Sequence, residues 1–266
     1  MLKKAASLAT LMLLLVAAGA TADIRAIKGT DLQVGPGSAM APGSRDTAPE
    51  DEGTANLTAI HAIPGLGAPV DVFVNDSYLL TFDFNESAGP LALPRGEYTI
   101  EVRLADGTSV LKTVVDPQPG KDYTVIAHLA YRDGANNTIA ISTFENNNRP
   151  LRDGRTRITV RHTADAPSVD LDLQRVLENE SGPAARYMNI GGQGLSNQAG
   201  MMPGSFGSVD LWGGKFIAVL YPEGSTTPAF ESPAVPFKPG VNYVVYAIGS
   251  LFDGSFTLFV QTVDTM

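Results

Sequence analysis

The chain has 266 residues, no cysteine and a formal net charge of −9 at pH 7. The lack of cysteine excludes disulfide frameworks, thiolate metal sites and cysteine nucleophiles. The acidic balance repels nucleic-acid phosphates and anionic membrane surfaces, so we expect no nucleic-acid partner.

Residues 1–22 have the three parts of a secretory signal peptide. Lys3 and Lys4 form a basic start, an apolar run covers 8–18, and Ala20-Thr-Ala22 is a small-residue cleavage site. The apolar run is too short to cross a bilayer comfortably, so we expect export to the periplasm or the cell exterior, with no membrane span after signal removal. Without the signal, 17 basic residues remain against 28 acidic ones, a formal charge of −11.

The next segment, residues 23–55, is rich in Gly, Pro, Ala, Ser and Asp. It has few large apolar side chains, so it cannot bury enough surface to offset the entropy lost on ordering. We predict a disordered lead segment.

The remaining chain contains two copies of one β-domain. Leu57-Thr-Ala-Ile-His61 in the first copy matches Ile158-Thr-Val-Arg-His162 in the second, and Gln118-Pro-Gly-Lys-Asp-Tyr123 matches Lys238-Pro-Gly-Val-Asn-Tyr243. An internal repeat of this kind indicates two structural units of about 100 residues each. We therefore predict a first repeat at 56–147 and a second at 156–266, joined by a short polar segment.

Both copies show the alternation of β-strands with frequent turn signals. In Tyr98-Thr-Ile-Glu-Val-Arg-Leu104 apolar and polar residues alternate, and Asp106-Gly107 then marks a hairpin. Pro-Gly at 119–120 and 239–240 specifies type II turns, and the tyrosines that follow, Tyr123 and Tyr243, resemble the tyrosine corner of Greek-key sandwiches. We predict an all-β fold of two tandem immunoglobulin-like, Greek-key antiparallel β-sandwiches.

The second copy carries additional residues at about 175–207, with Gly-Pro, Gly-Gly and Met-Met-Pro-Gly sequences. Long loops on a rigid sandwich commonly carry function, so we expect a site in or beside this insertion.

These segments resemble the domain of unknown function 4397 family of exported bacterial proteins. The shared features are the strand ending in His, the Val-Asp-Val sequence at 70–72, Leu93-Pro-Arg-Gly-Glu-Tyr98 and the Pro-Gly-x-x-Tyr-x-Val-x-Ala strand. The resemblance covers 57–146 and, more loosely, 156–260. It implies a β-sandwich at the cell envelope or outside the cell, with no agreed activity. The second copy departs from the pattern, because Leu211-Trp-Gly-Gly-Lys-Phe216 replaces the Leu-Pro-x-Gly-x-Tyr sequence.

Each copy has a histidine at the end of one strand and an aspartate on the next, namely His61 with Asp71 and His162 with Asp170. Such pairs suggest acid–base or metal chemistry. Strand alternation, however, places the histidines inward and the aspartates outward, and it also places Thr159 and Arg161 outward. We therefore interpret these residues as structural. The histidine is expected to bond the backbone of the following bend, and the aspartate to fasten a turn or an adjacent loop.

Asp165, Asp170 and Asp172 are the candidate oxygen ligands for calcium, but their spacing fits no EF-hand loop. We expect no metal and no cofactor. The sequence also has no serine-hydrolase, zinc-protease or phosphate-binding motif, so we identify no catalytic residues.

Outward-facing aromatic residues are the candidate ligand contacts. Phe73 lies between two inward valines, and Trp212, the single tryptophan, follows the insertion, with Tyr187 and Phe206 expected nearby. Exposed aromatic residues on a sandwich contact sugars and protein partners. The alternative is that Phe73 packs against the neighbouring domain and Trp212 closes the base of the insertion.

The favoured hypothesis is an exported, non-enzymatic protein with a binding or adhesion role at the cell envelope, whose partner is a glycan, a polymer or a protein at the cell surface. One alternative is an enzyme with a site in the insertion that uses Arg186, Tyr187 or Asp210. No set of nucleophile, base and orienting group is recognisable, which disfavours it. The other alternative is a structural spacer without a ligand.

Overall fold

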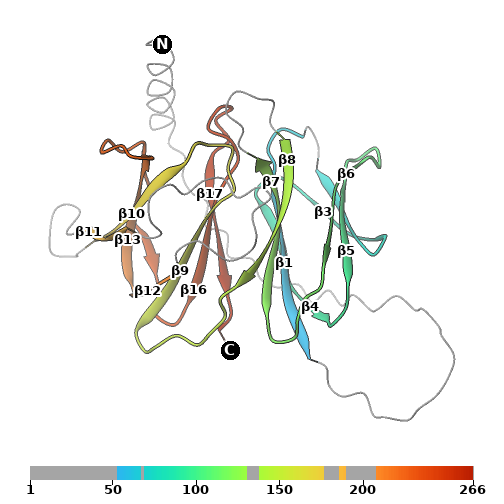
Figure 1. The fold of residues 1–266 in the computed structure, drawn as a ribbon, viewed down its shortest axis with the longest axis horizontal. Helices are drawn as coiled ribbons and strands as arrows, with labels where there is room; N and C mark the ends of the chain where they lie inside the picture. Colours follow the sequence, from blue (N-terminus) through green and yellow to red (C-terminus); the bar gives the residue numbers. More distant parts are fainter. Residues whose placement is uncertain (1–52, 67–68, 131–137, 177–185, 190–207, 266) are drawn as a thin grey trace. The chain divides into compact units, whose positions relative to one another are not determined.

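The computed structural model describes residues 53–66, 69–130, 138–176, 186–189 and 208–265. The predicted signal peptide, residues 23–52 of the predicted lead segment and most of the predicted insertion lie outside this range. The described residues form strands and turns and contain no helix, which confirms the all-β fold (Figure 1). Accordingly, no described segment is a helix long and apolar enough to cross a membrane.

The first repeat has eight strands in two four-stranded sheets. One sheet has the order β4-β1-β7-β8 and the other the order β3-β2-β5-β6. The strands are β1 (Thr54–Ala62), β2 (Val70–Val74), β3 (Ser77–Phe82), β4 (Glu86–Pro94), β5 (Tyr98–Arg103), β6 (Ser109–Val115), β7 (Asp122–Ala130) and β8 (Thr138–Asn146).

The second repeat has the same two sheets with the same order of strands. They are β12-β9-β16-β17 and β11-β10-β13, where β13 also pairs with β14 and β15. The strands are β9 (Arg155–His162), β10 (Val169–Val176), β11 (Arg186–Asn189), β12 (Val209–Trp212), β13 (Gly214–Pro222), β14 (Phe230–Glu231), β15 (Val235–Phe237), β16 (Asn242–Ile248) and β17 (Thr257–Val263). The broken pair β14 and β15 takes the place of the continuous β6.

Strand boundaries differ from the expected ones at two places. β1 begins at Thr54, inside the segment predicted to be disordered, because Ala55 and Leu57 already bury apolar side chains in the sheet. β10 runs to Val176, so the first two residues of the insertion predicted at about 175–207 lie in this strand. β11 lies within the predicted insertion.

Each repeat buries one apolar core between its two sheets. In the first, Leu57 and Val125 from one sheet pack with Val72 and Ile100 from the other. The second core contains Ile158, Leu171, Phe216 and Val245, among others, again from both of its sheets. The inward rows predicted from alternation are therefore correct, and the all-β sandwich architecture is confirmed. The prediction of antiparallel sheets is wrong for β9 and β16, because these two strands pair in parallel.

The Pro-Gly turns and the tyrosines after them also form as predicted. Gly120 and Gly240 have φ of +72° and +79°, the left-handed conformation that position i+2 of a type II turn requires. The backbone N–H of Gln118 donates to the Tyr123 hydroxyl at 3.4 Å, and that of Lys238 to the Tyr243 hydroxyl at 3.1 Å. These tyrosine corners are placed equivalently in the two repeats.

The outward face of β9 differs from its prediction. Thr159 and Arg161 point away from the sandwich core, but both are buried. Arg161 is covered by Tyr246 of the adjacent β16, whose hydroxyl accepts a 2.8 Å hydrogen bond from Arg161 Nη1. Alternation correctly predicted the direction of these side chains but not their exposure, because neighbouring residues contact them, Tyr246 at Arg161 and Ser208 at Thr159.

Candidate functional site

Trp212 forms an exposed aromatic contact with Arg155 on the edge of the second repeat. It is the last residue of β12 and lies directly opposite Arg155, the first residue of β9. The Arg155 guanidinium carbon lies 4.4 Å from the centre of the indole ring, within the range of a cation–π interaction. The Trp212 side chain nevertheless remains 53% exposed. We call this pair the Trp212–Arg155 platform.

The backbone of Gly154 fixes the position of the indole ring. Gly154 has φ of +73°, and a Cβ atom added to it would lie 2.5 Å from Cζ3 of Trp212. The ring therefore occupies the space that any other residue at 154 would fill. The N–H of Gly213 also donates to the Gly154 carbonyl at 3.2 Å, which ties the end of β12 to the start of β9. The tryptophan is exposed and held in place by its neighbours.

A charged pair behind the platform supports the same two strands. Arg157 lies two pairs further along the ladder, opposite Asp210. Its Nε and Nη2 atoms donate to the two carboxylate oxygens of Asp210 at 2.8 and 3.0 Å. Its Nη1 donates to the carbonyls of Asn147 and Arg149 at 3.2 and 2.9 Å. Asp210, a candidate in the enzymatic alternative, is thus engaged in a bidentate ion pair.

The first repeat shows that the fold does not require this platform. Thr54 and Pro94 form the pair that corresponds to Arg155 and Trp212. The preceding glycine is retained, since Gly53 has φ of +67°. The same topology therefore forms with neither an arginine nor an aromatic residue at this corner. A feature present in only one copy is more informative about function than a feature that both copies share.

A second aromatic–arginine contact lies on the first repeat. As predicted, Phe73 faces away from the core of its sheet. It packs edge-to-face on Tyr78 with ring centres 5.8 Å apart, and Arg103 lies 4.1 Å above its ring. Phe73 is half-buried by these neighbours from its own sheet, whereas Tyr78 is 59% exposed. In the second repeat the register places Asp172 where Phe73 stands, so this contact is also specific to one copy.

Polar groups surround the Phe73 contact and hold Arg103 in place. Arg103 donates to Glu101 at 2.6 Å and lies 3.7 Å from Asp76. The hydrogen bond from Arg103 lowers the pKa of Glu101 to about 2, so this carboxylate is charged at all physiological pH values. Asp71, predicted to fasten a turn or loop, accepts a hydrogen bond from Thr81 on the neighbouring strand at 2.5 Å instead. Asp71 bonds to Thr81 because the two residues lie directly opposite each other on adjacent strands.

In the second repeat the histidine and the aspartate lie where their structural interpretation predicts. His162 Nε2 lies 3.0 Å from the carbonyl of Pro167 in the following bend. Asp170 accepts a 3.0 Å hydrogen bond from the N–H of Gly224, in the turn after β13. No hydrogen bond or ion pair joins the two side chains. Burial lowers the pKa of His162, which keeps the ring neutral.

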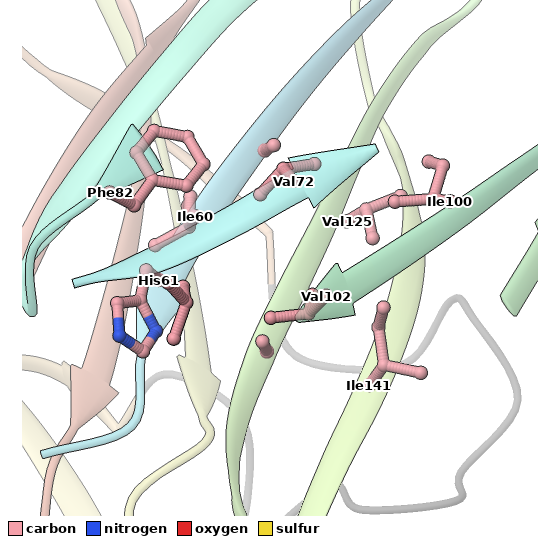
Figure 2. A pocket seen from close by; sticks show the side chains of 11 residues that line it. Ile60, His61, Val72, Phe82, Ile100, Val102, Val125 and Ile141 are labelled. Carbon is pink, nitrogen blue, oxygen red and sulfur yellow. The ribbon is translucent and has the colours of Figure 1, made fainter. Parts of the chain in front are cut away.

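His61 lies at the edge of the first core and lines a small cavity together with Val72 and Phe82 (Figure 2). Its Nδ1 atom is buried and has no hydrogen-bond partner among the described residues, so the expected bond to the bend is not formed by this atom. Burial lowers the pKa of His61 to about 4, although Asp83 and Glu86 raise it. A buried neutral ring is suited to packing and not to proton transfer at neutral pH.

Two predicted contacts cannot be placed beside Trp212. Phe206 lies outside the described residues, and Tyr187 is described only as a backbone position in β11. Over the described part of the chain, no group of three His, Asp or Glu residues is arranged to hold a metal ion.

Sequence reasoning identified Trp212 and Phe73 but missed their arginine partners. Arg155 and Arg103 lie 57 and 30 positions away in sequence, so only strand register brings them together. The internal repeat held a signal for Arg155. When the two copies are aligned, Arg155 takes the position of Thr54 and Trp212 that of Pro94, and each two residues form a pair in their own sheet.

Fold and surface together define an all-β protein of tandem sandwiches in which each copy carries its own aromatic–arginine contact. Residues 55–172 match the model of the family described as a domain of unknown function (DUF4397). The resemblance inferred from the sequence is thereby confirmed. The matched range extends from β1 into β10.

A comparison with curated proteins gives no match. Among solved structures, the chain is similar to a crystal structure of a candidate cell adhesion protein from Bacteroides fragilis. The two share 12% identity over 81% of this chain and 99% of the other, with a TM-score of 0.25. At that score the likeness assigns neither fold nor function to this chain.

Proposed function

We propose that this protein is an exported, non-enzymatic binding protein of the cell envelope, and that the Trp212–Arg155 platform contacts a glycan or a glycan-like polymer. The observation that carries the proposal is that a large indole ring is both half exposed and fixed against Gly154 and Arg155. A rigid exposed aromatic residue binds with little loss of conformational freedom.

The chemistry of the platform supports this ligand class. An indole ring offers an apolar face and edge for the C–H groups of a sugar ring. The adjacent guanidinium of Arg155 offers N–H donors for hydroxyl or carboxylate oxygens. Aromatic and arginine residues are also the types that dominate binding energy at interfaces. Apolar contact and hydrogen-bond donation on one surface match an amphipathic polymer.

The location of polar groups supports a role without catalysis. All three histidines of the chain, His61, His128 and His162, are buried. Burial lowers the pKa of each, to about 4 for His61 and His128. The chain has no cysteine. Two of the commonest catalytic side chains are therefore either absent or inaccessible. Export is supported by the signal-peptide pattern at 1–22.

A binding screen against glycans and cell-wall polymers tests the proposal. The chain without its predicted signal peptide is compared with Trp212→Ala and with Phe252→Ala, a control that removes another exposed aromatic residue of the second repeat. We expect binding by the wild type and by Phe252→Ala, and at least a tenfold loss for Trp212→Ala, because interface tryptophans typically contribute about 2 kcal/mol or more. Circular dichroism establishes that each variant is folded.

Two results would contradict the proposal. Equal binding by Trp212→Ala and the wild type would move the site elsewhere, and a variant lacking 177–207 would then test the insertion. No binding by any version would favour a structural spacer without a ligand.

A further inference from the structure

The second repeat encloses an apolar cavity of about 120 Å³ between its two sheets. Phenylalanines line much of it, with aliphatic residues from β16 and β17 opposite, including Phe216, Phe230, Phe237, Phe256, Val245 and Leu258. None of the lining residues is charged. A smaller cavity of about 20 Å³ in the first repeat lies at a different place in its sandwich, because its lining includes His61, Val72 and Phe82 from β1, β2 and β3 (Figure 2).

One substitution between the copies removes side-chain volume at the cavity of the second repeat. Strand register places Ala218 of β13 opposite Leu173, and Ile100 of β5 opposite Val74. Ala218 and Ile100 therefore occupy equivalent positions, and each lines the cavity of its own repeat. Replacing an isoleucine by an alanine removes three buried carbon atoms, which leaves space that a close-packed core otherwise lacks.

A bulge in the neighbouring strand lies at the same cavity, since Ser232, Pro233 and Ala234 line it. Between the pairs Phe216↔Val235 and Val219↔Glu231, β13 has two residues, and the opposite chain has three, Ser232 to Ala234. In the first repeat two residues of β6 face two of β5 over the same interval. The extra residue divides the strand into β14 and β15 and opens the edge of the sandwich at the cavity.

The bulge is built by specific hydrogen bonds. The N–H of Ser232 donates to the Ala218 carbonyl at 2.9 Å, and the Ser232 hydroxyl accepts from the Ala218 N–H at 2.9 Å. The same hydroxyl donates to the carbonyl of Pro233 at 2.9 Å. Pro233 has no N–H to donate, so it stops the ladder without leaving an unpaired donor. Because its hydrogen bonds are already made, Ser232 presents little polarity to the cavity.

We infer that this cavity is a binding site for a neutral, phenyl-sized hydrocarbon group. An engineered apolar cavity of about 150 Å³ in another protein stays dry and binds benzene, so a space of this size and lining accepts one aromatic ring. The phenylalanine rings on its wall offer the edge-to-face contacts that a ring prefers. The opening at Ser232–Ala234 lets the rest of a larger molecule extend outward. None of the lining residues belongs to the Trp212–Arg155 platform, so the inference stands independently of the proposed function.

Benzene is the probe that tests this site, with the melting temperature of the full chain as the readout. Benzene is expected to raise the melting temperature of the wild type in a concentration-dependent way. Ala218→Ile, which restores the residue of the first repeat, is expected to abolish that rise. Ile217→Val alters the next side chain, which does not line the cavity, and is expected to retain it. Trp212→Ala is also expected to retain it, which separates this site from the platform.

A second measurement on the wild type makes the test independent of the folding of any variant. Nuclear Overhauser effects from benzene protons are expected at the methyl groups of Val245, Leu258 and Val260, all of which line the cavity. The inference is overturned if benzene produces neither a melting shift nor these effects. It is likewise overturned if folded Ala218→Ile responds to benzene as the wild type does.

Discussion

Arg157 and Asp210 form a two-point contact across β9 and β12, with two donor–acceptor distances of 2.8 and 3.0 Å. Arg157 is buried, whereas the Asp210 side chain is 41% exposed. Arg157→Met should lower the free energy of unfolding by about 2 kcal/mol, because it removes hydrogen bonds from a charged donor to a carboxylate and to two linker carbonyls. Urea unfolding measures this change. Arg152→Met, at an exposed position three residues before β9 begins, is the control and should change stability little. Equal effects of the two variants would mean that the contact adds nothing.

Gly154 and Gly53 form a natural matched pair for the Trp212 contact. Both have left-handed backbones, with φ of +73° and +67°. Either substitution by alanine costs about 1–2 kcal/mol through backbone strain. Only Gly154→Ala also displaces an indole ring, so it should destabilise more than Gly53→Ala. Trp212 is the single tryptophan, and its emission wavelength and quenching by acrylamide should therefore change in Gly154→Ala alone. An unchanged emission would mean that the ring does not rest on this glycine.

His61 makes the stability of the first repeat depend on pH. Its pKa is about 4 in the folded chain, below the ordinary value of 6.5. Between these values the unfolded chain binds a proton that the folded chain does not, so stability is complete above pH 6.5 and falls as the pH drops toward 4. The loss from this group is about 2–3 kcal/mol at pH 4.5.

His61→Gln should reduce that dependence, because glutamine does not titrate. The readout is the difference in melting temperature between pH 7.5 and pH 4.5, which should be smaller in the variant than in the wild type. Asp83 and Glu86, the two carboxylates that act on the ring, remain in both proteins. The same pH difference in both would show that His61 titrates alike in the folded and unfolded chains.

The equivalence of Ile100 and Ala218 predicts opposite effects of opposite substitutions. Ile100→Ala should destabilise the first repeat by about 2–4 kcal/mol, because it removes buried methyl groups and leaves a cavity. Ala218→Ile should stabilise the second by about 0.5–1 kcal/mol, since space for the added atoms already exists. Differential scanning calorimetry measures both. A destabilised Ala218→Ile would mean that the surrounding phenylalanines cannot accommodate the larger side chain.

The sequence alone was sufficient for the architecture, because the signals that specify it are local. Alternation in Tyr98–Arg103 identifies a strand, and Pro-Gly before Tyr123 and Tyr243 identifies a corner within five residues. The duplication then provided an independent check on each pattern. His162 was placed correctly by the same reasoning, since the bend that it bonds follows it directly.

The candidate sites depend on the register of strand pairing and on side-chain volume, and the alternation of apolar and polar residues predicts neither. Arg155 reaches Trp212 only through the pairing of β9 with β12, and Arg103 reaches Phe73 only through β2 and β5. The cavity of the second repeat depends on one alanine and one extra residue near Pro233. Ala218 has no distinguishing feature in the sequence until it is compared with Ile100, the equivalent residue in the first repeat. Similarly, the exposure of Arg161 depended on Tyr246, a residue 85 positions away.

The position of the first strand of each repeat has a consequence for the order in which the chain can fold. β9 lies between β12 and β16 and pairs with β16 in parallel, Arg157 opposite Asn242 and His162 opposite Ala247. Its central place in the sheet is therefore completed only when residues about 85 positions later are available. Such long-range closure slows folding and makes it cooperative. During synthesis from the N-terminus, β9 therefore lacks its parallel neighbour until most of the repeat has been made. The shortest fragment expected to fold is a whole repeat, obtained by cutting the chain between 147 and 154.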